Sequence, residues 1–256
     1  MSELLTDIVP PIGRVTLNRP DKRNALNSAM WMELTHLAAR LSQDDRLRVV
    51  LLTGAGHEAF SAGADIIEMR QSLADPPKMQ TMQQAVLDAQ VAWERIPIPT
   101  IAMIRGACTG GGCGLALSCD LRLATPDAFF AIPPAKLGLA YSLADTKRLY
   151  DLVGPSRTKE ILFTGRRIDA TEALHLGMIN RIVPSDELES YALALAGDIA
   201  GNAPNSVRAA KAVVSLISAG TDAETPGSKR YYDESFSSSE FLEGARAFME
   251  KRSPKF

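Results

Sequence analysis

The chain has 256 residues, of which 46% are hydrophobic and 23% are charged, and its formal net charge is -2. This composition is typical of a globular protein with one large domain, or one domain and an appendage. The balance of charge argues against a nucleic-acid-binding surface, and no apolar stretch approaches the roughly 20 residues that span a bilayer. The N-terminal residues lack the basic-then-apolar pattern of a signal peptide. We therefore expect no nucleic-acid partner, no membrane partner and a cytoplasmic location.

The three cysteines, Cys108, Cys113 and Cys119, lie close together in the sequence. Their odd number argues against a disulfide framework, and their spacings are not those of a zinc site. No histidine or aspartate is evident as a partner that would activate Cys113 as a nucleophile. We therefore expect buried core cysteines in a reducing compartment, and no metal.

Apolar periodicity and turn residues predict strands that alternate with helices along most of the chain. The pattern indicates an α/β core over residues 1–203 and a C-terminal helical region over residues 204–256. In chain order we expect a strand over 13–18, a helix over 28–42, a strand over 47–53, helices over 65–71 and 77–96, a strand over 101–105, a helix over 112–118, strands over 121–124 and 128–132, helices over 146–152, 155–162 and 171–176, a strand over 179–183 and a helix over 185–202.

Two glycine-containing segments about fifty residues apart each follow a strand-like apolar run and open a helix-like one. They are Phe60-Ser61-Ala62-Gly63-Ala64-Asp65-Ile66 and Gly110-Gly111-Gly112-Cys113-Gly114-Leu115. A helix N-terminus presents unpaired backbone N–H groups and a partial positive charge. Two such termini directed at one point can hold an oxyanion, so we expect chemistry in which a carbonyl oxygen becomes negative.

Further motifs extend over nearly the whole chain: Leu17-Asn18-Arg19-Pro20, Asn24-Ala25-Leu26, Ser118-Cys119-Asp120, Leu137-Gly138-Leu139, Thr164-Gly165-Arg166, Ala173 with Gly177, and Ala247-Phe248-Met249-Glu250-Lys251-Arg252. Together with the two glycine segments, they resemble the crotonase superfamily, also called the enoyl-CoA hydratase/isomerase superfamily. The resemblance implies a crotonase-like spiral of ββα units with a C-terminal helical trimerisation region. It also implies a homotrimer or dimer of trimers, and an acyl-CoA thioester as ligand.

The resemblance also implies roles for individual residues. The backbone N–H groups of Ala64 and Gly111 would bind the thioester oxygen. Coenzyme A would enter as part of the thioester substrate, so no separate cofactor is expected. The residues that would line the coenzyme A site are Lys22, Arg23, Ala25, Ala62, Ala64, Asp65 and Ile66.

The chain departs from the family at the two positions where hydratases carry glutamates. One of these positions is Gly114 and the other is Pro134, and neither residue can transfer a proton. Acid–base groups of this kind contribute about 10²–10⁴-fold each to a rate. Hydratase activity is therefore disfavoured, and a simple enoyl isomerase that needs the carboxylate at Pro134 is disfavoured as well.

The polar groups that remain near the expected acyl site are Tyr141, Ser142 and Asp145. Dehalogenase-like and dienoyl-isomerase-like members of the superfamily carry an aspartate at the position of Ser142. Methylmalonyl-CoA decarboxylase-like members carry a tyrosine at the position of Tyr141. We expect Tyr141 to be the strongest candidate for the proton donor. Asp145 is either an acid or base, or the N-cap of a helix that begins at Thr146.

The predicted function is therefore that of an acyl-CoA-binding enzyme that acts through a thioester enolate held by backbone N–H groups. A lyase or isomerase step in acyl-CoA metabolism is the specific expectation. The alternatives are a methylmalonyl-CoA-type decarboxylase and a catalytically silent acyl-CoA-binding module.

Overall fold

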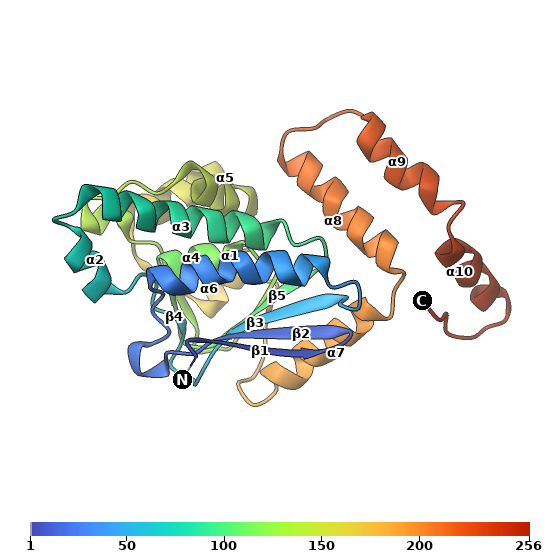
Figure 1. Cartoon of the computed structure of the whole chain (residues 1–256), viewed down its shortest axis with the longest axis horizontal. Coiled ribbons are helices and arrows are strands. Elements are labelled where there is room, and N and C mark those ends of the chain that lie inside the picture. Colours follow the sequence, from blue (N-terminus) through green and yellow to red (C-terminus); the bar gives the residue numbers. More distant parts are fainter. Residues whose placement is uncertain (1) are drawn as a thin grey trace.

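The structure is a computed structural model that describes residues 2–256, and its core contains two β-sheets (Figure 1). The larger sheet has the strand order β1-β2-β3-β5-β7-β10, and the smaller has the order β4-β6-β8-β9. The strands are β1 (Leu4–Val9), β2 (Ile12–Leu17), β3 (Val49–Gly54), β4 (Ala59–Ser61), β5 (Thr100–Ile104), β6 (Ala107–Thr109), β7 (Leu121–Ala124), β8 (Phe129–Ala131), β9 (Arg167–Asp169) and β10 (Arg181–Ile182).

Helices surround the two sheets and continue beyond them at the C-terminus (Figure 1). The α-helices are α1 (Ser28–Gln43), α2 (Ile66–Ser72), α3 (Pro76–Glu94), α4 (Gly111–Leu117), α5 (Leu143–Thr164), α6 (Ala170–His175), α7 (Leu188–Ala200), α8 (Pro204–Ser218), α9 (Pro226–Ser235) and α10 (Ser239–Met249), and two 3-10 turns lie at η1 (Pro20–Lys22) and η2 (Pro134–Leu137).

The larger sheet is buried on both faces. Successive side chains of a strand point to opposite sides, so one strand contributes to two apolar clusters. In β3, Val50 and Leu52 join the apolar cluster that contains α1 and α3 residues, whereas Val49 and Leu51 join the cluster that contains α7 residues. The strands β2, β3, β5, β7 and β10 are parallel to one another. The edge strand β1 forms an antiparallel hairpin with β2. Burial on both faces explains why β3 and β5 are continuous apolar runs.

The smaller sheet positions the two glycine segments. Three of its strands, β4, β6 and β8, each follow a strand of the larger sheet and precede a helix or a 3-10 turn. This repeat of two strands and a helix confirms the α/β fold with a spiral of ββα units. The prediction missed β4, β6 and β9, which have three residues each, and it also missed β1. Three residues are too few to show an apolar period.

The two helices predicted over 146–152 and 155–162 correspond to the two segments of α5, and the first segment begins at Leu143, before the predicted start. The helix is broken at Gly154, where a φ of 76° is not helical. Pro155 follows directly and cannot donate a backbone hydrogen bond, which explains the break within the helix.

The C-terminal helices α8, α9 and α10 project from the core, as the orange to red ribbon in Figure 1 shows. Lys211 on α8 reaches back to the core, where its Nζ donates to Asp120 Oδ2 at 2.6 Å and to the carbonyl oxygen of Ile98 at 3.1 Å.

Within residues 2–256, no helix is long and apolar enough to cross a membrane. The helical region exposes large apolar side chains, including Val214, Ile217, Phe241, Leu242 and Phe248.

Candidate active site

The first glycine segment forms a turn between β4 and α2. Gly63 has a φ of +91°, a conformation that L side chains rarely adopt. Leu26 donates its backbone N–H to the Gly63 carbonyl oxygen at 2.7 Å, and Asp65 donates its backbone N–H to the Leu26 carbonyl oxygen at 2.9 Å. Ala64 lies between these two bonds, and its own N–H meets no acceptor among residues 2–256. The turn is thus fixed on both sides of an unpaired donor.

The second glycine segment forms the equivalent turn between β6 and α4. Gly111 is the first residue of α4, so its N–H has no partner within the helix, and it meets no acceptor elsewhere in the described chain. A β-carbon on Gly63 would lie 2.7 Å from the Thr109 carbonyl oxygen and 3.3 Å from the Gly111 nitrogen. The two turns are therefore in contact, and the unpaired N–H groups of Ala64 and Gly111 lie in neighbouring turns. Two unpaired donors in turns that touch each other form a candidate oxyanion site.

Within α4, Gly114 lies one helical turn after Gly111, so the two positions are close on the helix surface. A β-carbon on Gly114 would lie 2.8 Å from Asp145 Oδ1 and would also overlap Gln90 Nε2. The volume that a side chain at Gly114 would need is therefore filled by Gln90 from α3 and Asp145 from α5. A carboxylate is present beside Gly114, but a different helix supplies it.

Asp145 is buried, with 6% of its surface exposed. Ser142 Oγ donates to Asp145 Oδ2 at 2.7 Å, and Arg148 Nη1 donates to Asp145 Oδ1 at 3.1 Å. Burial raises the pKa of the Asp145 carboxyl group above its ordinary value, although the bonds from Ser142 and Arg148 act in the opposite direction. A buried carboxyl group with a raised pKa has the character expected of an acid or base.

The alternative that Asp145 caps a helix starting at Thr146 is wrong. Ser142 is the N-cap of α5, because its hydroxyl oxygen accepts a hydrogen bond from the Asp145 backbone N–H at 3.0 Å. Asp145 lies inside the first turn of the helix. Its side chain therefore belongs to the buried cluster beside Gly114. The Ser142 hydroxyl group donates to this same carboxylate.

Two polar residues of this cluster have no motif in the sequence. Arg148 Nη2 donates to Glu94 Oε2 at 2.8 Å, and Arg148 Nη1 donates to Gln90 Oε1 at 3.3 Å. Gln90 and Arg148 are both buried, and they come from helices that lie far apart in the chain. Their approach follows from tertiary packing, so a sequence pattern offers no signal for it.

Tyr141 also faces this region of the interior. Its hydroxyl group and the Gln90 Nε2 atom are buried and have no hydrogen-bond partner among residues 2–256. Burial, followed by the charge of Asp145, raises the pKa of Tyr141 well above its ordinary value. The side chain therefore remains a protonated phenol that can donate a hydrogen bond.

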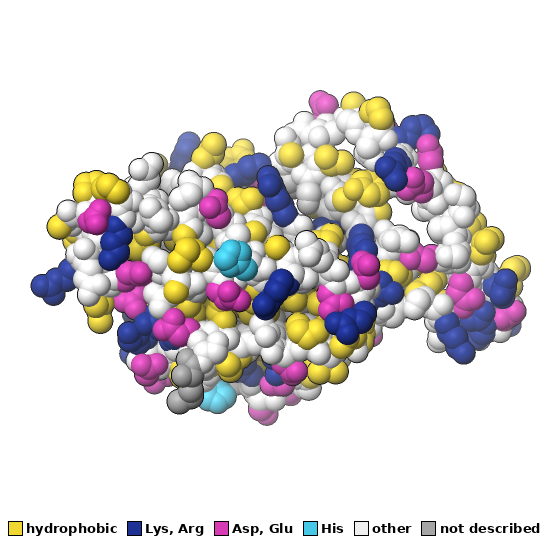
Figure 2. Space-filling view, viewed as in Figure 1, with side chains coloured by type: hydrophobic (Ala, Val, Ile, Leu, Met, Phe, Trp, Pro, Cys, Tyr) yellow, Lys and Arg dark blue, Asp and Glu magenta, His cyan; other side chains and the backbone are white. Residues whose placement is uncertain are grey.

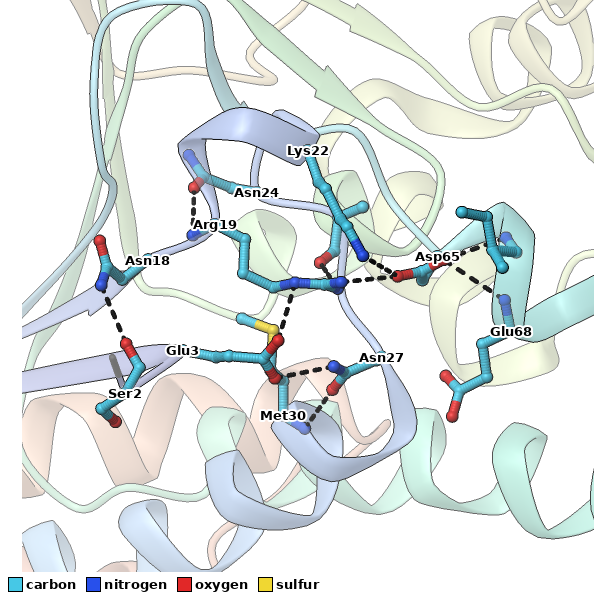
Figure 3. Close-up of polar contacts among 12 residues, drawn as sticks. Ser2, Glu3, Asn18, Arg19, Lys22, Asn24, Asn27, Met30, Asp65 and Glu68 are labelled. Carbon is cyan, nitrogen blue, oxygen red and sulfur yellow. Dashed lines mark hydrogen bonds and ion pairs between the residues drawn. The ribbon is translucent and has the colours of Figure 1, made fainter.

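The residues expected to line the coenzyme A site differ in exposure, and Figure 3 shows two of them, Lys22 and Asp65, which form an ion pair at 3.8 Å. Lys22 and Arg23 are exposed in and after the η1 turn, and Arg23 has a φ of 50°. Asp65 instead is buried and paired with Arg19, whose Nη2 donates to Asp65 Oδ2 at 2.8 Å. The remaining residues surround the Ala64 turn: Ala25 is buried, Ala62 and Ala64 are half-buried, and Ile66 is exposed.

Pro134, the other position where the resemblance implies a glutamate in hydratases, begins the η2 turn and is half-buried. All three cysteines are buried. Burial raises the pKa of the Cys108 thiol well above its ordinary value, and raises that of Cys119 to about 12. The Cys108 and Cys119 thiols are therefore protonated core side chains. Within residues 2–256, no three side chains of the His, Cys, Asp or Glu type gather as metal ligands would.

Comparison with known proteins identifies the family of the chain. A profile described as enoyl-CoA hydratase/isomerase matches residues 9–256. A short-chain-enoyl-CoA hydratase of Clostridium acetobutylicum is 35% identical over 240 residues, covering 93% of this chain and 91% of the relative. A mitochondrial Delta(3,5)-Delta(2,4)-dienoyl-CoA isomerase of Rattus norvegicus is 36% identical over 215 residues, covering 77% of this chain and 63% of the relative.

Solved structures show the same similarity. The structure of an enoyl-CoA hydratase/isomerase family protein from Hyphomonas neptunium has a TM-score of 0.96 at 40% identity, with 100% of this chain and 97% of the other covered. An enoyl-CoA hydratase from Bacillus anthracis has a TM-score of 0.91 at 34% identity, with 100% and 99% covered. The fold is that of the crotonase superfamily. Within it, the chain belongs to the enoyl-CoA hydratase/isomerase family.

Proposed function

We propose that the protein is an acyl-CoA enzyme in which the N–H groups of Ala64 and Gly111 hold the thioester oxygen while Asp145 transfers a proton at the acyl chain. The carrying observation is that Asp145 Oδ1 lies 2.8 Å from the β-carbon position of Gly114. The superfamily resemblance places a glutamate at this position in hydratases. Asp145 therefore brings a carboxyl group to the same surroundings from α5.

The electrostatics of Asp145 support this role. A carboxyl group is a better acid or base near neutral pH when its pKa is raised toward that range, and burial shifts the pKa of Asp145 in this direction. Ser142 Oγ donates to its second oxygen, which fixes the orientation of the carboxyl group. In this proposal Tyr141 acts as a hydrogen-bond donor, because its pKa keeps the phenol protonated.

One carboxyl group suits some reactions of a thioester enolate better than others. A single base can remove a proton from one carbon and return it to another, which is an isomerisation, or can assist a lyase step. Hydration by two carboxylates would need a second group at Pro134, which has none. We therefore favour an isomerase or lyase step over hydration.

Decarboxylation of a methylmalonyl-type thioester is a weaker alternative. The positive charge of Arg148 is already compensated by ion pairs with Glu94 at 2.8 Å and Asp145 at 3.1 Å. A substrate carboxylate placed beside Asp145 would meet like charge rather than an uncompensated cation. The cluster at Gly114 is thus poorly suited to an anionic acyl group.

A panel of thioesters tests the proposal. We would measure binding by calorimetry with crotonyl-CoA, but-3-enoyl-CoA and methylmalonyl-CoA. Hydration and decarboxylation would be followed by mass spectrometry, and double-bond migration, which does not change the mass, by the absorbance of the conjugated enoyl thioester. We expect saturable binding, little hydration of crotonyl-CoA, and migration of the double bond of but-3-enoyl-CoA. Binding without turnover of any thioester would favour the silent acyl-CoA-binding module. No binding at all would overturn the proposal.

A further inference from the structure

We infer that Arg19 is a positioning residue, which holds the Ala64 N–H in the orientation that a thioester oxygen needs by clamping Asp65. This inference rests on the proposed function, because it concerns one of the two proposed oxyanion donors. The hydrogen bonds and ion pairs of Arg19 go to neither Asp145 nor Gly111, so its effect would pass through the turn that contains Ala64.

The side chain of Arg19 is buried and all three of its nitrogens are used (Figure 3). Nη1 donates to the Ala25 carbonyl oxygen at 2.8 Å, and Nη2 donates to Asp65 Oδ2 at 2.8 Å. Nε forms an ion pair with Glu3 Oε1 at 3.0 Å. The guanidinium group therefore joins the backbone just before Leu26 to the residue just after Ala64.

Asp65 transmits this constraint to the turn. Its Oδ1 accepts the backbone N–H groups of Ile67 at 3.0 Å and Glu68 at 3.3 Å, and thus caps α2. Its own backbone N–H donates to the Leu26 carbonyl oxygen at 2.9 Å. Both carboxylate oxygens and the backbone N–H of Asp65 are therefore committed, which fixes the peptide that follows Ala64.

The peptide between Gly63 and Ala64 carries the Ala64 N–H, and no side chain of its own restricts its conformation on the Gly63 side. It follows Gly63, which can adopt many backbone conformations at little cost in free energy. The Gly63 carbonyl oxygen accepts the Leu26 N–H at 2.7 Å, so the position of Leu26 determines both neighbours of Ala64. Arg19 holds the chain beside Leu26 through the Ala25 carbonyl oxygen.

Only the planar fork of arginine can satisfy both partners at once. A lysine at position 19 keeps the positive charge, but its single ammonium group lacks the fixed geometry that spans Ala25 and Asp65. An oxyanion donor is effective when it is oriented before the charge develops. Loss of the clamp should therefore weaken the polarisation of the thioester more than it weakens the binding of coenzyme A itself.

The test is infrared spectroscopy of butyryl-CoA that carries ¹³C at the thioester carbonyl, bound to the full-length protein. A carbonyl group that is polarised more strongly by fixed donors than by water absorbs at a lower frequency than the same group in water, so the shift reports the oxyanion site directly. The variants are Arg19→Lys and Asp65→Asn, since asparagine remains a good helix cap without the charge. The control is Arg14→Lys, which alters the exposed pair between Arg14 and Glu189 at 2.7 Å.

We expect the wild-type protein and the control to lower the carbonyl frequency equally, and both clamp variants to lose at least half of that shift. Calorimetry of Arg19→Lys should show free coenzyme A binding within about 2-fold of wild type, while turnover of both clamp variants falls by roughly 10²-fold, as when an oxyanion donor is lost. If Arg19→Lys does not fold, Asp65→Asn alone decides the matter, because it removes the same ion pair with a smaller change.

Folded variants that retain the full shift would overturn the inference and leave Arg19 as a purely structural residue. A wild-type protein that binds butyryl-CoA without any shift would overturn the proposed function, and the inference with it. The two failures are distinct, because the first appears only in the variants and the second is already visible in the wild type.

Discussion

Asp145 Oδ1 lies 2.8 Å from the point where a β-carbon on Gly114 would stand, so these two residues cannot both contribute a side chain to the same space. The absence of a side chain on α4 permits the carboxyl group of α5 to enter. The pair Gly114 and Asp145 is therefore best understood as a unit. This relationship also determines what substitutions at either position should do.

Gly114→Glu should not restore hydration of crotonyl-CoA. The new side chain would overlap Asp145 Oδ1 and Gln90 Nε2, so we expect a loss of about 1–3 kcal/mol in the free energy of unfolding. Thermal denaturation checks the stability, and loss of enoyl absorbance checks the hydration. Gly197→Glu is the control, because a β-carbon there meets no atom within 4 Å. Hydration by the Gly114 variant at about 10 s⁻¹ or faster would contradict this prediction.

Tyr141→Phe should lower turnover at nearly unchanged affinity for acyl-CoA. Its hydroxyl group has no hydrogen-bond partner among the described residues, so removing it leaves no other buried group unsatisfied. We therefore expect a melting temperature equal to or higher than that of the wild type. A lower melting temperature with unchanged turnover would show that the hydroxyl group is structural, and would remove Tyr141 from the mechanism.

The difference in stability between the wild type and Asp145→Asn should depend on pH, because only the wild type titrates at this position. The folded-state pKa of Asp145 lies above its ordinary value of 3.8, so the folded state binds more protons than the unfolded state between these two values. The free energy of unfolding of the wild type therefore falls as pH rises through that window, and Asp145→Asn lacks this loss. Urea titrations should find the variant at least as stable as the wild type at pH 7. A variant much less stable at pH 7 but not at pH 4 would reverse the sign and contradict the raised pKa.

The helices α8 to α10 should mediate assembly into a trimer or a dimer of trimers. Phe248 is 86% exposed and Leu242 is 61% exposed in the single chain, and Figure 2 shows apolar side chains at the surface of this region. An isolated chain rarely exposes large apolar groups in this way without a partner. Phe248→Asp should therefore dissociate the assembly. Light scattering that gives a wild-type mass near 27.6 kDa at micromolar concentration would contradict the prediction.

The sequence was sufficient to predict the elements with long apolar patterns. Buried strands such as β3 and amphipathic helices such as α1 were predicted within a few residues of their observed bounds, because burial on a fixed face imposes a clear period. In the smaller sheet, β8 was predicted as part of an apolar run, whereas the equally short strands β4, β6 and β9 show no such period and were missed. Their pairing depends on neighbours distant in the chain, so only the folded structure reveals them.

The candidate site divides in the same way. Ala64 and Gly111 could be proposed from the sequence because their turns carry local glycine patterns, and the structure brings those turns into contact. The relation between Gly114 and Asp145 was not predicted, since it depends on how α4 packs against α5. Gln90 was missed for the same reason, because a glutamine on a helix is more often solvent-exposed.

The most direct test of the central claim measures the exchange of the acyl-CoA α-protons with deuterium from the solvent. Exchange requires formation of the enolate and transfer of a proton, and it does not require the natural acyl group to be known. Mass spectrometry of butyryl-CoA incubated in D₂O would compare the wild type, Asp145→Asn and the control Asp151→Asn, which alters an exposed ion pair on the same helix. The account predicts exchange by the wild type and the control, and a rate lower by roughly 10²–10⁴-fold for Asp145→Asn at unchanged affinity. Equal exchange by all three proteins would show that another group moves the proton, and would contradict the account.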